Sequence, residues 1–208
     1  MIFRSFGFGV LMFLATACPA LAAVHCEIAD AGQVLGTAQV PRGDFGTPLD
    51  MIVGTDGFPG DVDLYKVFIF DPAGFSAEVA YFGGSVGDSQ LFLFDSGGTP
   101  VLSNDDQETS LWSNIEAGSL TGGAGIYYLA FSDYNNDPLA SAGIGLAGWN
   151  DDYREPDTGP YEIRLTGVTF AETPEPSSLL LWSFLGVAAM AAWCCRRSTI
   201  LARSRPGS

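Results

Sequence analysis

Short apolar segments separated by turn residues constrain the fold of this chain more than any other feature. Between positions 24 and 173 no apolar stripe recurs at the helical spacing of about 3.6 residues, whereas aromatic and β-branched residues gather in short runs. Turn sequences rich in glycine and aspartate separate those runs. The pattern predicts an all-β fold, an antiparallel β-sandwich of the jelly-roll kind. The predicted strands span residues 64–70, 75–82, 90–95, 99–103, 126–131 and 161–170.

Two stretches of this region carry weaker patterns. Glycine, proline and aspartate break up residues 24–60, where positions 34–40 predict one edge strand. Residues 132–160 are too long for a plain hairpin connection and contain several polar clusters with glycine or proline. We expect this second stretch to form an elaborated, exposed loop, which makes it the favoured loop for binding a ligand.

The first 22 residues have the parts of a secretory signal peptide. A basic residue near the start precedes an apolar stretch, and Ala20 and Ala22 form a small-x-small cleavage site. Residues 1–22 are therefore predicted to be a signal peptide helix that is removed, so that Ala23 begins the mature chain. The alternatives are a retained N-terminal helix and a lipoprotein attached through Cys18.

A second uncharged segment spans residues 177–195. As a helix rising about 1.5 Å per residue it is roughly 28 Å long, just enough for a bilayer core of about 30 Å. Arg196 and Arg197 follow it and predict that this end stays in the cytoplasm. The sequence therefore predicts a single transmembrane helix within residues 174–208, with residues 24–173 forming one domain outside the cytoplasm.

Charge divides the chain in the same way. All 24 acidic residues lie between Glu27 and Glu175, where only four basic residues occur, and the other five arginines lie in the terminal segments. Such a negative field repels phosphate backbones, which argues against nucleic acid as a partner, and attracts divalent cations and basic surfaces. Cys26 is the only cysteine of the predicted mature domain, so no disulfide can form within it.

Residues suited to catalysis are scarce. His25 is the only histidine and lies next to the predicted cleavage site, in what we expect to be a mobile terminus. A Ser/His/Asp or Cys/His site would need that terminus to fold over a nucleophile, and nothing in the pattern supports a nucleophile paired with Lys66. The sequence therefore favours a protein that is not an enzyme. Abundant paired carboxylates leave a hydrolase as a minor alternative.

Oxygen-rich side chains gather in the predicted loops. Calcium takes about six to eight oxygen ligands, and a divalent ion would relieve repulsion if these carboxylates converge at one end of the sandwich. None of the clusters has the spacing of an EF-hand, and the plain alternative is that Asp and Asn cap turns. The candidate calcium ligands are Asp61, Asp63, Asn104, Asp105, Asp106 and Asp133.

Aromatic side chains suggest a second kind of ligand. Flat rings suit the faces of sugars, so an exposed tryptophan can serve as a carbohydrate platform. We expect Trp112 to be buried in the sandwich. Trp149 is flanked by Gly148 and Asn150 and is expected to be exposed, which makes it the candidate residue for binding a sugar.

The C-terminal segment resembles a known sorting signal. Pro174, Glu175 and Pro176, followed by the apolar span and by Arg196 and Arg197, resemble the PEP-CTERM signal of bacterial exported proteins. The resemblance implies processing by signal peptidase and by an exosortase, a membrane-embedded cysteine peptidase of bacteria that make exopolysaccharide or biofilm matrix. The tail after the arginines is longer than the short basic end usual in that family.

The middle of the chain resembles the bacterial pre-peptidase C-terminal domain and its relatives, over a core of residues 57–170. The resemblance implies a jelly-roll-like sandwich that serves as an accessory or binding module. The matching sequences lie at residues 60–67, 88–95, 104–106, 125–130 and 159–163.

These features together predict a non-enzymatic exported protein. It would be held first as a single-pass inner-membrane protein and then delivered to the cell surface or extracellular matrix, as the sorting resemblance implies. Its role there would be structural, adhesive or binding, with exopolysaccharide as a partner. The alternative is a permanently anchored periplasmic or surface protein that binds calcium or carbohydrate and keeps its tail.

Overall fold

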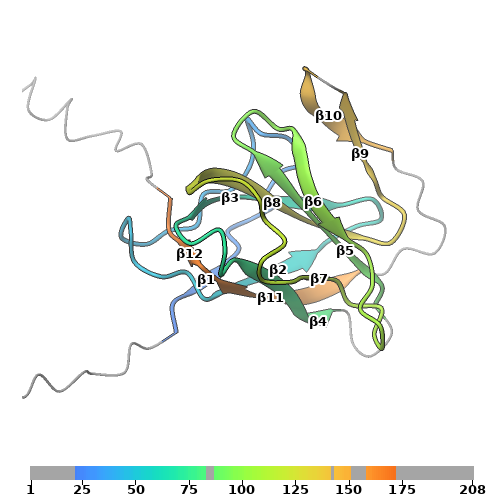
Figure 1. Cartoon of the computed structure of the whole chain (residues 1–208). Coiled ribbons are helices and arrows are strands. Elements are labelled where there is room, and N and C mark those ends of the chain that lie inside the picture. Colours follow the sequence, from blue (N-terminus) through green and yellow to red (C-terminus); the bar gives the residue numbers. More distant parts are fainter. Residues whose placement is uncertain (1–21, 83–86, 142, 151–157, 172–208) are drawn as a thin grey trace, which may run out of the picture.

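The computed structural model describes residues 22–82, 87–141, 143–150 and 158–171 (Figure 1). Within these ranges the chain forms twelve β-strands and no helix, which confirms the all-β prediction. No described helix has the length and apolar character that crossing a bilayer requires. The predicted signal peptide, sorting motif and transmembrane segment lie outside the described residues.

Ten of the strands form two five-stranded sheets, and two form a separate hairpin. The first sheet has the order β1 (Val24–Cys26), β2 (Met51–Asp56), β11 (Gly159–Thr166), β4 (Ser76–Phe82) and β7 (Asn114–Ile115). The second sheet has the order β12 (Val168–Thr169), β3 (Val62–Ile69), β8 (Gly125–Asp133), β5 (Ser89–Asp95) and β6 (Pro100–Asn104). The hairpin consists of β9 (Pro138–Ser141) and β10 (Gly145–Trp149). Named strands pair antiparallel except β1 and β2, which pair parallel.

Alternating side chains of the two sheets meet in one apolar core. The inward residues of β3 are Tyr65, Val67 and Ile69, as the period of two in a strand requires. The ring of Tyr161 from β11 stacks on Phe131 from β8, with 3.9 Å between the ring centroids. The two sheets therefore face each other as the layers of a sandwich-like fold.

All six predicted strands are present, but a bulge changes the inward face of β4. The sequence pattern predicts that Tyr81 shares a face with Val79. In the structure Glu162 pairs with Tyr81 and Ile163 pairs with Val79, so Ala80 is left without a partner. This extra residue turns Tyr81 outward, where it is 39% exposed, and buries Phe82 in the core.

The last predicted strand, residues 161–170, is divided between the two sheets. It breaks at Gly167, which has a φ of 73°, and β11 and β12 on either side belong to different sheets. A Cβ atom at this position would lie 2.7 Å from the carbonyl oxygen of Asp71. Glycine is therefore required at this corner both by the positive φ and by the close approach of the backbone.

The edge strand predicted at residues 34–40 is not formed. Gln39 makes an isolated bridge to Tyr65, and a turn occupies residues 35–37. The edge position of the first sheet belongs instead to β1, which lies beside β2. The short apolar runs of this region alternate too briefly to distinguish a strand from a packed loop.

The stretch 132–160, predicted to be an exposed loop, folds in part as the β9–β10 hairpin. The described residues of β10 cover the outer face of the second sheet, where Leu146 and Trp149 pack with Phe92 and Phe94. Residues 151–157, which include Asp151 and Asp152, fall outside the described residues.

The described chain begins and ends at one end of the two sheets, which we call the tail end (Figure 1). The N–H of Asp50 donates to the carbonyl of Ala23 at 2.9 Å, and the N–H of Phe170 donates to the carbonyl of Thr47 at 3.1 Å. The opposite end, where β2 finishes and β3 starts, is called the acidic end below.

Candidate cation-binding site

Three strands carry an aspartate on their inward face at the acidic end. On β2 the inward positions are Ile52, Gly54 and Asp56, and all three are buried. By the same alternation, Asp63 lies on the inward face of β3 and Asp133 lies on the inward face of β8. Because β3 and β8 pair through Val62 and Ser132, these carboxylates lie at one end of the core. The apolar core therefore ends in a layer of acidic side chains.

Asp56 is the most unusual member of this layer. It is 2% exposed, and neither carboxylate oxygen has a hydrogen-bond partner among the described residues. The backbone of Phe58 lies near enough to lower its pKa slightly, without reaching hydrogen-bonding geometry. A buried carboxylate without donors is costly unless it is protonated or bound to a cation.

Asp63 is held by a chain of hydroxyl groups that crosses the core. The hydroxyl of Tyr161 donates to Asp63 Oδ2 at 2.6 Å, and the hydroxyl of Tyr65 lies 2.6 Å from that of Tyr161. Gly54 on β2 leaves room for this arrangement, because a Cβ atom there would overlap the Tyr161 hydroxyl. Two strands of the first sheet and one of the second thus orient a single carboxylate.

Two acidic residues of the segment after β1 complete the group. Glu27, Asp30 and Asp63 each offer an oxygen, and these oxygens all lie within 4.8 Å of one another. Two oxygens on opposite sides of a calcium ion, each about 2.4 Å from it, are separated by a similar distance. Glu27 is fixed by the N–H groups of Ala31 at 3.0 Å and Thr55 at 2.8 Å.

A cleft of about 540 Å³ leads from this group to solvent. Glu27, Asp30 and Asp61 line it, together with the exposed ring of Phe58. Asp61 is 4% exposed, and its Oδ2 accepts a hydrogen bond from the N–H of Gly57 at 2.8 Å. The cleft therefore gives a small ion access to Glu27, Asp30 and Asp61.

The electrostatics favour a proton or a cation at the acidic end. Burial, followed by the charges of Asp133, Asp61 and Asp63, raises the pKa of Asp56 to about 9. Burial is also the main reason that the pKa of Asp63 rises to about 8, against the opposing hydrogen bond from Tyr161. Among the described residues, no basic side chain contributes to the pKa shifts of Asp56 and Asp63.

The carboxyl groups of Glu27 and Asp63 lie close enough to affect each other. The proximity of Glu27 contributes to the raised pKa of Asp63. Burial still leaves the pKa of Glu27 above its usual value, and burial likewise raises the pKa of Asp61. Without a cation, the acidic end therefore holds protons at neutral pH.

A second, more open acidic group lies at the same end of the second sheet. Oxygens of Asp88, Asp105 and Asp106 come within 4.8 Å of one another. Burial and the charges of Asp106 and Asp137 raise the pKa of Asp105. These residues lie before β5 and after β6, at the edge of the sheet farthest from β12.

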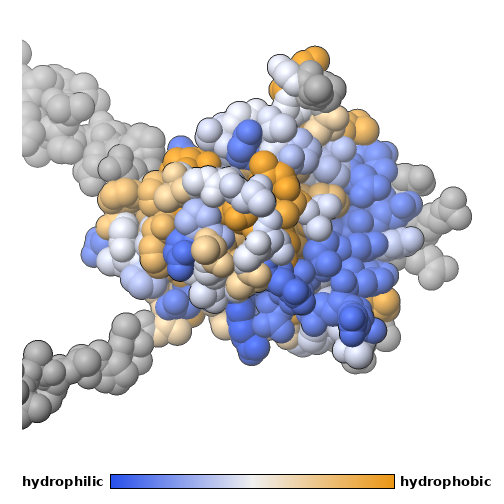
Figure 2. All heavy atoms as spheres, in the orientation of Figure 1, coloured by the Kyte–Doolittle hydropathy of each residue, from blue (hydrophilic) through white to orange (hydrophobic). Residues whose placement is uncertain are grey.

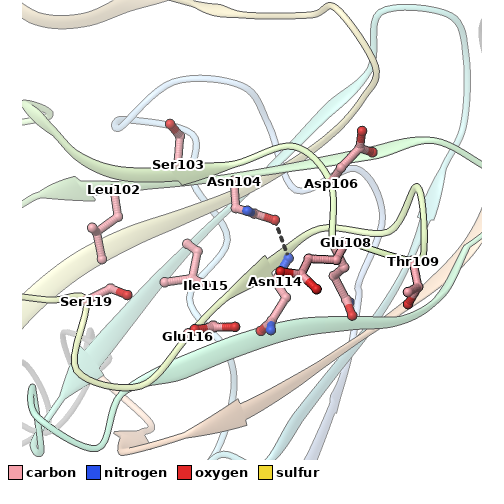
Figure 3. Close-up of a pocket in the computed structure, with 11 residues that line it drawn as sticks. Leu102, Ser103, Asn104, Asp106, Glu108, Thr109, Asn114, Ile115, Glu116 and Ser119 are labelled. Atoms are coloured by element: carbon pink, nitrogen blue, oxygen red, sulfur yellow. Dashed lines mark hydrogen bonds between the residues drawn. The ribbon is translucent and has the colours of Figure 1, made fainter.

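Beside the second group a polar cleft of about 550 Å³ lies between the edge strands β6 and β7 (Figure 3). Asn104 lines this cleft, and its Oδ1 accepts a hydrogen bond from the N–H of Asn114 at 2.6 Å. The amide of Asn104 therefore ties the two sheet edges together. Figure 3 shows the carboxylate of Asp106 pointing away from Glu116 on the floor of the cleft.

The structure thus divides the predicted calcium ligands into two groups. Asp61, Asp63 and Asp133 lie with Glu27, Asp30 and Asp56 in what we call the inner group, and Asp105 and Asp106 lie in the second group. Sequence reasoning missed four members of the two groups: Glu27, Asp30, Asp56 and Asp88. For Asp56 a signal existed, because it continues the alternation of Ile52 and Gly54 on β2.

The donor set of the inner group fits a hard divalent cation. All its side-chain donors are carboxylate oxygens, which suit calcium rather than zinc, because zinc sites draw mainly on cysteine and histidine. Glu27, Asp30, Asp56, Asp61 and Asp63 are the residues that would hold the ion. Such an ion would replace the protons that these carboxyl groups otherwise keep.

The expectation that His25 lies in a mobile terminus is wrong. His25 is part of β1, is 3% exposed, and its Nε2 lies 2.7 Å from Gln39 Oε1. Burial lowers the pKa of the imidazole, which stays neutral at pH 7. Its ring packs edge-on against Tyr65, with 6.0 Å between centroids, so its contacts are those of a core residue.

The expectation that Trp149 is exposed is also wrong. The side chain is 6% exposed, and its indole N–H donates to the carbonyl of Gln33 at 2.8 Å. Phe92 and Phe94 pack against the ring edge-on at 5.5 and 6.2 Å. The ring therefore joins the hairpin to the sheet and presents no free face to a sugar.

No protein-family model matches the chain, and no curated protein is significantly similar to it.

Proposed function

We propose that this chain is a non-enzymatic exported protein whose sandwich binds calcium at its acidic end. The burial of Asp56, with no hydrogen-bond partner among the described residues, carries the calcium part of the proposal. A buried, ionised carboxylate beside Asp61 and Asp63 destabilises the fold when no cation is present. A bound divalent ion would remove this destabilisation by neutralising the repelling charges. The jelly-roll-like form and binding role implied by the sequence resemblance agree with this function.

Export and sorting rest on the terminal segments. The predicted signal peptide of residues 1–22 would take the domain across the inner membrane. The apolar span 177–195 would hold it there until the PEP-CTERM motif is processed. The protein would then act at the cell surface or in the extracellular matrix in a structural, adhesive or binding role, with exopolysaccharide as its partner.

Calcium should raise the melting temperature of purified residues 24–173, which contain both sheets and the described core. A ligand at about 100 times its Kd stabilises a fold by about 2.7 kcal/mol. For a domain of this size that corresponds to a rise of about 5–10 °C. Scanning calorimetry in millimolar calcium and in chelator measures the shift, with magnesium as the comparison ion. An unchanged melting temperature in millimolar calcium contradicts the calcium proposal.

Processing distinguishes a sorted protein from a permanently anchored one. We expect mass spectrometry of the protein from its native cells to show a chain that starts at Ala23 and lacks the segment after Pro176. Expression in cells without an exosortase is the control and should yield the chain with its tail. A tail that is still attached in the native cells supports the alternative, a permanent anchor.

A further inference from the structure

Three phenylalanines form an exposed patch at the tail end, which we call the aromatic patch: Phe45, Phe68 and Phe70. Phe45 is 54% exposed and Phe70 is 52% exposed. The rings of Phe45 and Phe68 meet edge-on, with 5.7 Å between their centroids. Phe68 lies near the end of β3, and Phe70 is the first residue after that strand. Large apolar side chains grouped on a surface indicate a contact with another apolar body.

The aromatic patch lies beside the point where the chain leaves the sandwich. Phe68 pairs with Thr169 of β12, and the N–H of Phe70 donates to the carbonyl of Gly167 at 3.0 Å. The described chain ends two residues after Thr169, at Ala171. Figure 2 shows hydrophobic residues gathered toward the tail end and hydrophilic residues over the opposite side of this view.

The length of chain beyond Ala171 limits how far the sandwich can move from the apolar span. Five residues separate Ala171 from Ser177, where the predicted transmembrane span begins. Even fully extended, this connection reaches only about 20 Å. Since the span is expected to start at the outer surface of the bilayer, the tail end is the part of the domain held against that surface.

Charge is mixed at the tail end, whereas both acidic groups lie at the opposite end. The exposed Arg42 and Arg164 lie at the tail end, where Arg164 pairs with Met51 at the start of β2. The acidic groups lie at the other end of β3, whose eight residues span about 26 Å. Two exposed acids, Asp44 and Asp71, flank the aromatic patch and favour a membrane of low negative charge.

We propose that the aromatic patch inserts into the interface of the bilayer that carries the C-terminal span. Phenylalanine rings at the headgroup level gain from burial of their apolar surface. Docking would fix the orientation of the sandwich, with the tail end on the membrane and the calcium-binding end facing outward. This inference rests on the membrane anchoring in the proposed function and is independent of its calcium site.

Photo-crosslinking of the full chain in phosphatidylcholine vesicles tests the orientation. A benzophenone-bearing phenylalanine replaces Phe45 in one variant and Phe58 in a matched control. Phe58 is 49% exposed and lies at the acidic end. Trypsin cleaves after Arg42 and Lys66, so both sites fall in the same peptide and their lipid adducts can be compared directly by mass spectrometry.

We expect at least a fivefold excess of lipid adducts for the variant at position 45 over the variant at position 58. Flotation of the vesicles and extraction at alkaline pH measure insertion of the tail separately. Two results in a chain that floats would contradict the docking and leave the anchor intact. One is an equal yield of lipid adducts at positions 45 and 58, and the other is crosslinking of position 45 to protein alone. A chain that fails to float refutes the anchor, and the docking with it.

Discussion

Asp56→Asn should remove most of the calcium-induced rise in melting temperature. The same substitution should stabilise the calcium-free domain at pH 8, because it replaces a buried carboxyl group that must otherwise keep a proton. The two effects have opposite signs, and their combination identifies a ligand rather than a residue that only fills space. Calorimetry in calcium and in chelator measures both.

Two other variants locate the ion. Asp44→Asn alters an exposed carboxylate near the tail end and should leave both melting temperatures within about 1 °C of the parent. Asp106→Asn alters the second acidic group and should keep most of the calcium shift if the ion binds at the inner group. A shift that survives in Asp56→Asn and disappears in Asp106→Asn assigns the ion to the second group and contradicts our assignment.

The calcium-free domain should lose stability as the pH rises from about 4 to about 9. The folded-state pKa values of Asp56 and Asp63, about 9 and about 8, lie well above the 3.8 that is usual for an aspartate carboxyl group. In this window the folded state therefore binds more protons than the unfolded state, so the free energy of unfolding falls with pH. The loss should be steepest between the ordinary carboxyl pKa and about pH 8, where both groups are protonated in the folded state and ionised in the unfolded state.

Urea denaturation at a series of pH values in chelator measures this slope. Calcium should flatten the curve, because the ion stabilises the ionised carboxylates that the proton would otherwise neutralise. Its affinity should accordingly rise between pH 6 and pH 9, with protons released on binding. A calcium-free domain that is as stable at pH 9 as at pH 5 contradicts the buried, protonated state of these groups.

Most strands of the sandwich could be predicted from local pattern. Short runs of apolar and aromatic residues between turn sequences, such as residues 90–95 and 126–131, can be recognised as strands without tertiary information. The bulge at Ala80 could not be predicted, because it depends on the register between β4 and β11. The strand break at Gly167 could not be predicted either, because a glycine inside a strand pattern is compatible with a continuous strand and with a corner between two sheets.

The candidate site could be predicted only in part. The pair Asp61 and Asp63 was found because both lie in one short acidic sequence before an apolar run. Glu27 lies far from this pair in sequence and reaches it through the pairing of β1 with β2. Asp56 is only five residues from Asp61, but it belongs to the other sheet and reaches the pair through the packing of β2 over β3. Trp149 was misplaced because its polar neighbours in sequence do not reveal that the hairpin folds back onto the second sheet.

The sequence by itself determined the all-β class, the acidic character of the domain and the segments that predict export and sorting. These properties depend on composition and on short-range periodicity, which do not change when the chain folds. Only the tertiary structure decided which carboxylates are buried, that they end the core as one layer, and that the aromatic patch lies at the opposite end. Those arrangements arise from contacts between strands distant in sequence, where the burial of one face fixes the environment of every second residue.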